Sequence, residues 1–149
     1  MRHDLGPDDL DDLLDRPRLA ILATRRKDGT ALLSPVWHEW RDGAFLVAVE
    51  PSDGKLVHIA RDPLVSIVVA EDDPPYRGLE ITAPAEIVDI PYGPVIRRIG
   101  QRYIGNAVDR YWTDDSPGVV LRIAPGRLRG WDFKDDFPVD AFPDDPAPS

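Results

Sequence analysis

Two Asp-Gly dipeptides constrain the fold of this chain, because each one separates two apolar stretches of strand length. Asp28-Gly29 follows residues 19–24 and precedes residues 30–40. Asp42-Gly43 then precedes a third such stretch, residues 44–49. Asp-Gly is a preferred pair for the tight turn of a β-hairpin, which needs left-handed backbone angles. The first third of the sequence therefore predicts three consecutive antiparallel strands.

The rest of the chain continues this pattern with few and short helices. Further strands are predicted at residues 64–70, at residues 79–90 with a bulge or edge at Pro84, and at residues 119–123, resuming at 128–133. Helices are predicted from Pro7 and at residues 55–61 and 94–104. Most connections between strands are too short for parallel crossovers. We therefore expect a mainly β protein, a six-stranded antiparallel barrel with a few short helices.

Length and composition indicate one folded domain. The chain has 149 residues, of which 42% are hydrophobic, enough for a single core. Beyond Lys134 the sequence becomes acidic and rich in proline, which does not bury enough surface to order itself. We therefore predict a domain at residues 1–134 and a tail at residues 135–149, with Phe137 and Phe142 as the side chains able to dock the tail.

Charge and residue usage exclude several classes of function. The net charge is −9, with 18 basic and 27 acidic residues, so a polyanion such as nucleic acid is not an expected partner. There is no cysteine for a disulfide framework or a thiolate metal site. No apolar run approaches the roughly 20 residues that cross a bilayer. These features predict a cytoplasmic protein that binds neither nucleic acid nor a membrane, with no metal site.

Lys55 is the strongest candidate for contact with a ligand. It stands at the predicted start of the helix 55–61, where an ammonium and unpaired backbone N–H groups suit a phosphate, although a solvated surface lysine has the same local sequence. His58 follows one helical turn later and shares the face of Lys55. His38 lies on a predicted strand, where we expect an exposed or hydrogen-bonded structural role.

Trp37 and Trp40 are three residues apart on one predicted strand, so their side chains point to opposite faces. Only one of them faces the core. Trp37 is a candidate wall for a planar ligand, and core packing is the alternative. Ser34, Pro35 and Val36 would then contribute backbone groups and shape.

In sequence order, several short motifs resemble one known family. They are Leu22-Ala23-Thr24, Asp28-Gly29, Pro35-Val36-Trp37, Lys55, Arg61-Asp62-Pro63, Pro74-Pro75-Tyr76 with Leu79-Glu80, Arg102-Tyr103-Ile104-Gly105 and Gly130-Trp131-Asp132-Phe133. In this order the chain resembles the FMN-binding split barrels of the pyridoxamine 5'-phosphate oxidase type. Within them it is most similar to the actinobacterial branch that uses the deazaflavin coenzyme F420. The resemblance spans about residues 19–133.

The resemblance implies a homodimer with two cofactor sites in grooves between the subunits. The flavin-like ring would lie against Pro35-Val36-Trp37, and its phosphate near Lys55. Two positions depart from the family pattern, because Gly54 stands where relatives often carry Arg and His58 where many carry Asn. Losing the guanidinium removes a bidentate phosphate contact, while Gly54 lets the backbone approach and donate N–H groups.

Other residues receive weaker assignments. Tyr76 and Trp131 are candidates for the substrate side of the groove, with core or dimer-interface packing as the alternative. The basic run Arg25-Arg26-Lys27 is a candidate for binding the acidic tail of coenzyme F420, with a solvated hairpin tip as the alternative.

The activity implied is an oxidoreductase that transfers a hydride between reduced coenzyme F420 and an unsaturated or electrophilic small molecule. The cofactor supplies such chemistry, so no catalytic triad is required. Two alternatives remain open on the same fold. One is an FMN-dependent oxidase or reductase, and the other is a non-catalytic protein that binds a flavin or haem.

Overall fold

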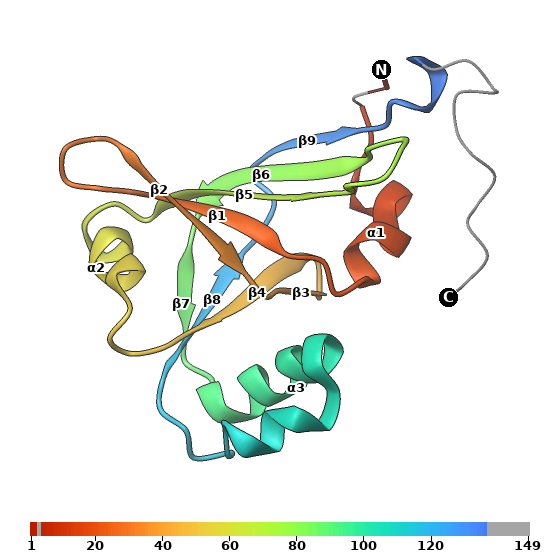
Figure 1. Ribbon diagram of the computed structural model, residues 1–149. Helices are drawn as coiled ribbons and strands as arrows, with labels where there is room; N and C mark the ends of the chain where they lie inside the picture. Colours follow the sequence, from red (N-terminus) through yellow and green to blue (C-terminus); the bar gives the residue numbers. More distant parts are fainter. Residues whose placement is uncertain (3, 137–149) are drawn as a thin grey trace.

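The structure is a computed structural model that describes residues 1–2 and 4–136. The predicted docking of Phe137 and Phe142, and the tail from residue 137 onward, lie outside the described residues. Two antiparallel sheets pack against each other (Figure 1). The strand order is β2-β1-β5-β6-β9 in the five-stranded sheet and β3-β4-β8-β7 in the four-stranded sheet. The predicted mainly β, split-barrel architecture is thereby confirmed.

The elements follow one another with short connections, as the turn residues predict. The strands are β1 (Ala20–Arg25), β2 (Ala31–Val36), β3 (Glu39–Arg41), β4 (Ala44–Val49), β5 (Leu64–Ala70), β6 (Gly78–Pro84), β7 (Glu86–Val88), β8 (Val119–Ile123) and β9 (Arg127–Trp131). The α-helices are α1 (Asp11–Asp15), α2 (Gly54–Arg61) and α3 (Tyr92–Ile104). Short 3-10 helices are η1 (Pro7–Leu10), η2 (Gly105–Arg110) and η3 (Lys134–Asp136).

Three long stretches of chain pass from one sheet to the other, which the sequence did not predict. The strand expected at residues 30–40 ends at Val36 in the five-stranded sheet and resumes at Glu39 in the four-stranded sheet. The strand expected at residues 79–90 divides in the same way after Pro84, whose missing N–H interrupts the ladder. β8 and β9 are the third such pair. The six predicted strands therefore appear as nine shorter segments.

The core lies between the sheets and is closed at one side by the N-terminal helical segment. On β1, side chains alternate between buried and more exposed positions, so that Leu22 points inward. Phe45, Ile67, Ile81 and Leu121 are likewise fully buried. The N-terminal segment adds the fully or almost fully buried side chains Leu10, Leu13 and Leu14. Burying each large apolar side chain contributes about 1.5–3 kcal/mol to stability.

α3 packs against the four-stranded sheet through a second, smaller apolar cluster. Val95 and Ile99 on the helix contact Leu46 on β4 and Val120 on β8. None of the helices in the described part of the chain is both long enough and apolar enough to span a bilayer.

Gly93 permits the close approach of α3 to the loop before β8. A Cβ atom at this position would lie 2.4 Å from the carbonyl oxygens of both Thr113 and Asp114, which are backbone atoms and do not move easily. We expect Gly93→Ala to destabilise the fold by about 1–3 kcal/mol, as overpacking does. Gly54→Ala is the matched control, because a Cβ there has no neighbour within 4 Å. Urea denaturation of both variants tests this, and equal stabilities would contradict it.

Candidate functional site

A groove lies between the end of β2, strand β4, the start of α2 and helix α3. Its volume is about 280 Å³. It forms where the chain leaves the five-stranded sheet after Val36 and the two sheets diverge. Its walls are the side chains and backbone of Pro35, Val36, Trp37, Val47, Ala48, Val49, Glu50, Asp53, Lys55, Tyr92, Ile96 and Trp112. Four of the predicted site residues, Lys55 and Pro35-Val36-Trp37, therefore meet in one cavity.

Lys55 lies in the first turn of α2 and is held there by Asp53. The Asp53 carboxylate caps the helix by accepting the backbone N–H of Lys55 at 2.9 Å, and it accepts the Lys55 ammonium at 2.8 Å. Only 13% of the Lys55 side chain is exposed. An ammonium has three N–H donors, so others remain for a ligand after this ion pair.

Asp53 remains ionised to acidic pH. Burial acts to raise the pKa of Asp53, but the two hydrogen bonds from Lys55 and the charges of Lys55 and His58 together hold the pKa below its usual value. The lysine is thus paired with a carboxylate that is ionised at neutral pH. Glu50 adds a second acidic side chain to the same groove.

The opposite part of the groove has an aromatic wall. The ring of Trp37 stacks on Tyr103 with a centroid distance of 5.1 Å and an interplanar angle of 9°. Trp112 meets Trp37 edge-on at 5.9 Å. The Tyr103 hydroxyl donates to the carbonyl of Arg18 at 2.7 Å, which fixes the ring that supports Trp37. Packing from these neighbours holds Trp37 in one orientation at the groove.

The two tryptophans of the β2–β3 segment take different environments, as predicted. Trp40 packs against the main core, where it meets Phe45 edge-on at 4.9 Å. Trp37 lies in the groove. Trp37 lies in the connection after β2 and Trp40 on β3, so the crossover between the sheets separates them and not alternation along one strand.

His38 is where the sequence interpretation fails. Its side chain is fully buried, and neither ring nitrogen has a hydrogen-bond partner among the described residues. Its backbone is bonded, because its N–H donates to the Tyr103 hydroxyl at 3.0 Å and its carbonyl accepts from Arg102. The expectation of an exposed side chain was wrong, because the crossover between sheets turns this residue inward, whereas hydrogen bonds of its backbone give it the alternative structural role.

Three predicted site residues lie near the groove without lining it. Ser34 on β2 pairs with Leu22 of β1. Gly54 is the exposed first residue of α2 and has no positive φ angle. The ring Nδ1 of His58 is 3.0 Å from the Thr24 hydroxyl, so His58 links α2 to β1.

Tyr76 and Trp131 lie elsewhere on the chain. β5 begins beside α2 and ends at Ala70, and Tyr76 belongs to the hairpin at that far end (Figure 1). The indole N–H of Trp131 donates to the carbonyl of Tyr76 at 2.9 Å, and the Arg129 guanidinium lies over the indole at 4.8 Å. Within one chain these two residues do not meet Lys55.

The sequence interpretation missed Glu50, Tyr92, Ile96 and Trp112, which complete the groove. Glu50 directly follows β4, so its nearness to Lys55 follows from the short connection. The other three come from α3 and the segment after it. No local pattern indicates that this helix would pack beside β2 and β4.

The groove fits a phosphate-bearing planar ligand in its main features. It combines a partly buried ammonium with the aromatic side chains of Trp37, Tyr92 and Trp112 in one lining. Asp53 and Glu50 reduce the positive potential there, so binding of a phosphate relies on Lys55 and nearby backbone N–H groups. Among the described residues, no group of His, Asp or Glu side chains is arranged to hold a metal ion.

Comparisons with known proteins agree with this architecture. The pyridoxamine 5'-phosphate oxidase family matches residues 7–132 of the chain. A conserved hypothetical protein from Mycobacterium tuberculosis is 27% identical, with a TM-score of 0.74 over 95% of this chain and 94% of that one. An F420 reductase is 29% identical, with a TM-score of 0.67 over 79% of this chain and 94% of the other.

One further solved structure shares the fold at lower identity. It is an FAD- and haem-binding protein from Mycobacterium smegmatis, 18% identical with a TM-score of 0.71, covering 98% of this chain and 77% of that one. A search among curated proteins found no significant match.

Proposed function

Because the chain belongs to the pyridoxamine 5'-phosphate oxidase family, we propose that it is an oxidoreductase that uses the deazaflavin coenzyme F420. In this proposal it transfers a hydride between the reduced cofactor and an unsaturated or electrophilic small molecule. Support comes from the 29% identity to an F420 reductase over 79% of the chain. The observation that carries the proposal is the meeting of Lys55 and Trp37 in one groove.

The main groove residues have separate roles in this proposal. Lys55 binds the cofactor phosphate with the ammonium donors that Asp53 leaves free. Pro35, Val36 and Trp37 hold the ring in one plane, and Tyr92, Ile96 and Trp112 exclude water from its surroundings. The bound cofactor supplies the hydride chemistry, and the chain supplies position and a dry surface.

Titration of the purified protein with coenzyme F420, FMN and haem tests this function. Cofactor fluorescence or absorbance reports binding. We expect saturable binding of coenzyme F420 in preference to the others. Preference for FMN would favour an FMN-dependent oxidase or reductase. Binding of haem alone would overturn the enzyme proposal and favour a non-catalytic binder, which Gly54 and the Asp53–Lys55 pair make the leading alternative.

We also propose a homodimer formed through the outer face of the five-stranded sheet. On this face Ile21 on β1 and Leu33 on β2 leave 37% and 64% of their surface exposed, beside Val68 on β5. Apolar side chains grouped in this way are typical of subunit interfaces. Tyr76 and Trp131 lie far from Lys55 on one chain, so their proposed place beside the substrate requires the second copy.

Light scattering after size-exclusion chromatography should give twice the chain mass of 16.6 kDa. Leu33→Lys should shift the protein toward monomer, because it places a charge in the apolar face. Ile87→Lys is the matched control, since Ile87 is a similarly exposed side chain (56%) on the other sheet. A wild-type monomer at micromolar concentration would contradict the shared-groove arrangement.

A further inference from the structure

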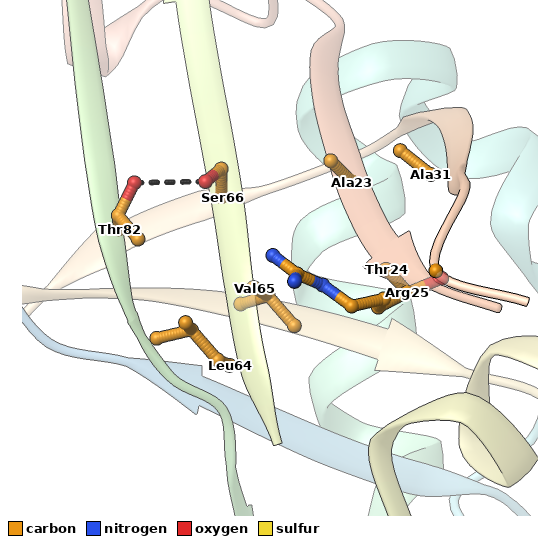
Figure 2. A pocket seen from close by; sticks show the side chains of 9 residues that line it. Ala23, Thr24, Arg25, Ala31, Leu64, Val65, Ser66 and Thr82 are labelled. Atoms are coloured by element: carbon orange, nitrogen blue, oxygen red, sulfur yellow. Dashed lines mark hydrogen bonds between the residues drawn. The ribbon is translucent and has the colours of Figure 1, made fainter. Parts of the chain in front are cut away.

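A second hollow lies on the outer face of the five-stranded sheet, next to the apolar side chains Ile21, Leu33 and Val68 of the proposed dimer interface and outside the groove that contains Lys55. Its volume is about 190 Å³, and it shares no lining residue with that groove. The Arg25 side chain reaches across it toward β5 from the end of β1, and Ser66 and Thr82 lie on the neighbouring strands β5 and β6 (Figure 2). The small residues Ala23, Gly29 and Ala31 leave the space open.

Arg25 has hydrogen-bonding capacity that the described residues do not use. Its nearest acidic group is Asp62, with Nε 3.9 Å from a carboxylate oxygen, which is too long for a hydrogen bond. Neither terminal nitrogen of this guanidinium has a hydrogen-bond partner among the described residues, and 56% of the side chain is exposed. The fork of N–H donors is therefore available to a planar oxyanion.

Ser66 and Thr82 add a hydroxyl donor to the same hollow. Their hydroxyl oxygens are 2.8 Å apart, so one O–H group donates to the other (Figure 2). Two hydroxyl groups carry two protons, and the bond between them uses one. The second proton remains for a ligand atom.

Guanidinium groups gather around this hollow, beside the carboxylate of Asp62. Arg61 donates to the backbone carbonyl of Arg25, and Arg127 on β9 pairs in register with Thr82. Both bring a positive charge to this end of the sheet. The complete chain has a net charge of −9. A local excess of guanidinium groups on an acidic protein favours a small anion at this position.

We propose that this hollow binds the carboxylate of a small aliphatic acid. The Arg25 fork donates two parallel hydrogen bonds to the carboxylate oxygens, and the Ser66–Thr82 pair donates a third. The small side chains of Ala23 and Ala31 and the apolar side chain of Leu64 accommodate a short aliphatic chain.

Nuclear magnetic resonance titration of the full-length protein with glutarate tests the site. We expect saturable amide shifts at residues 25, 66 and 82. Arg25→Gln should weaken this binding at least tenfold, and Ser66→Ala should weaken it several-fold. Arg26→Gln is the matched control, because the Arg26 guanidinium already bonds Thr30 and the carbonyl of Ala31. Inorganic phosphate and neutral glutaramide are the comparison ligands.

Three outcomes would overturn the proposal. One is an equal response of the Arg25→Gln and Arg26→Gln variants to glutarate, and a second is binding of glutaramide as strong as that of glutarate. The third is tighter binding of phosphate than of glutarate, which would reassign the site to phosphate.

The acid bound here has two possible sources, a free metabolite or the glutamate tail of coenzyme F420, and only the second rests on the proposed function. The affinities of wild type and Arg25→Gln for coenzyme F420 with and without its glutamate tail distinguish these two sources. If Arg25→Gln loses affinity only for the cofactor that carries the tail, the site binds the tail. If its affinity for both forms equals that of wild type, the site binds a free acid. If glutarate binds but coenzyme F420 does not, the proposed function fails and this site stands.

Discussion

Lys55→Ala is expected to weaken the binding of coenzyme F420 by roughly one to two orders of magnitude while leaving the fold intact. A charge-assisted hydrogen bond to phosphate contributes about 1.5–3 kcal/mol, and about 1.4 kcal/mol is a factor of ten in affinity. The structure gives a reason to expect a loss of affinity closer to two orders of magnitude. Without its ammonium partner, the Asp53 carboxylate remains in the groove and repels the phosphate.

Fluorescence titration of wild type and variant with coenzyme F420 measures this effect. Lys134→Ala is the matched control, because Lys134 is an exposed lysine in η3 outside the groove. Thermal unfolding confirms that both variants fold. If Lys55→Ala binds the cofactor as tightly as wild type, the phosphate lies elsewhere and the assignment of this groove is wrong.

Gly54→Arg tests the same phosphate site by a substitution that should increase cofactor affinity. The backbone of Gly54 has no positive φ angle, and a Cβ atom there has no neighbour within 4 Å, so a side chain fits. The new guanidinium should tighten cofactor binding by adding the bidentate contact that this chain lacks. Gly54→Gln controls for side-chain bulk without charge.

His38 is expected to make the protein less stable as the pH falls from 6.5 toward 4. Burial, and secondarily the charge of Arg102, lowers the pKa of His38 to about 4 from its usual 6.5. In the folded protein the ring stays neutral over this range, whereas in the unfolded chain it takes up a proton. The unfolded state therefore gains protons first, and the free energy of unfolding decreases by about 3 kcal/mol across the window.

His38→Leu should remove this dependence and increase stability at pH 7. Both ring nitrogens are buried without a partner, which costs about 1–3 kcal/mol relative to an apolar side chain of similar size. Urea denaturation of both proteins at several pH values gives the difference. Carboxylates titrate in both, so the difference curve isolates His38. Parallel stability curves between pH 4 and 7 would show that the imidazole is not the titrating group.

Strands and turns were predictable where the local sequence decides them. β4, β5 and β8 begin and end as the apolar runs and breakers indicate. Asp42 and Gly43 both have positive φ angles, as a tight hairpin turn requires. The break at Trp37-His38 was not predicted, and at Pro84 a bulge or an edge was predicted but no change of sheet. An apolar strand that changes sheets has the same sequence pattern as one that does not.

The candidate site was predictable only on the β2 and α2 sides. Pro35, Val36, Trp37 and Lys55 share a groove because they come from neighbouring parts of the chain. Tyr92, Ile96 and Trp112 complete it through tertiary packing of α3, which periodicity alone does not place. The buried imidazole of His38 was missed for the same reason, since its burial comes from Phe45 and Tyr103 on other elements.

The three sheet-crossing connections bear on how the molecule opens to solvent. Because β2–β3, β6–β7 and β8–β9 each place one continuous stretch of chain in both sheets, the two sheets are covalently joined at three places. Separating the sheets would therefore displace strands of both at once. We therefore expect the slowest-exchanging amide protons of β1 and β5 to exchange at the same free energy as those of β4 and β8, as a single cooperative unit.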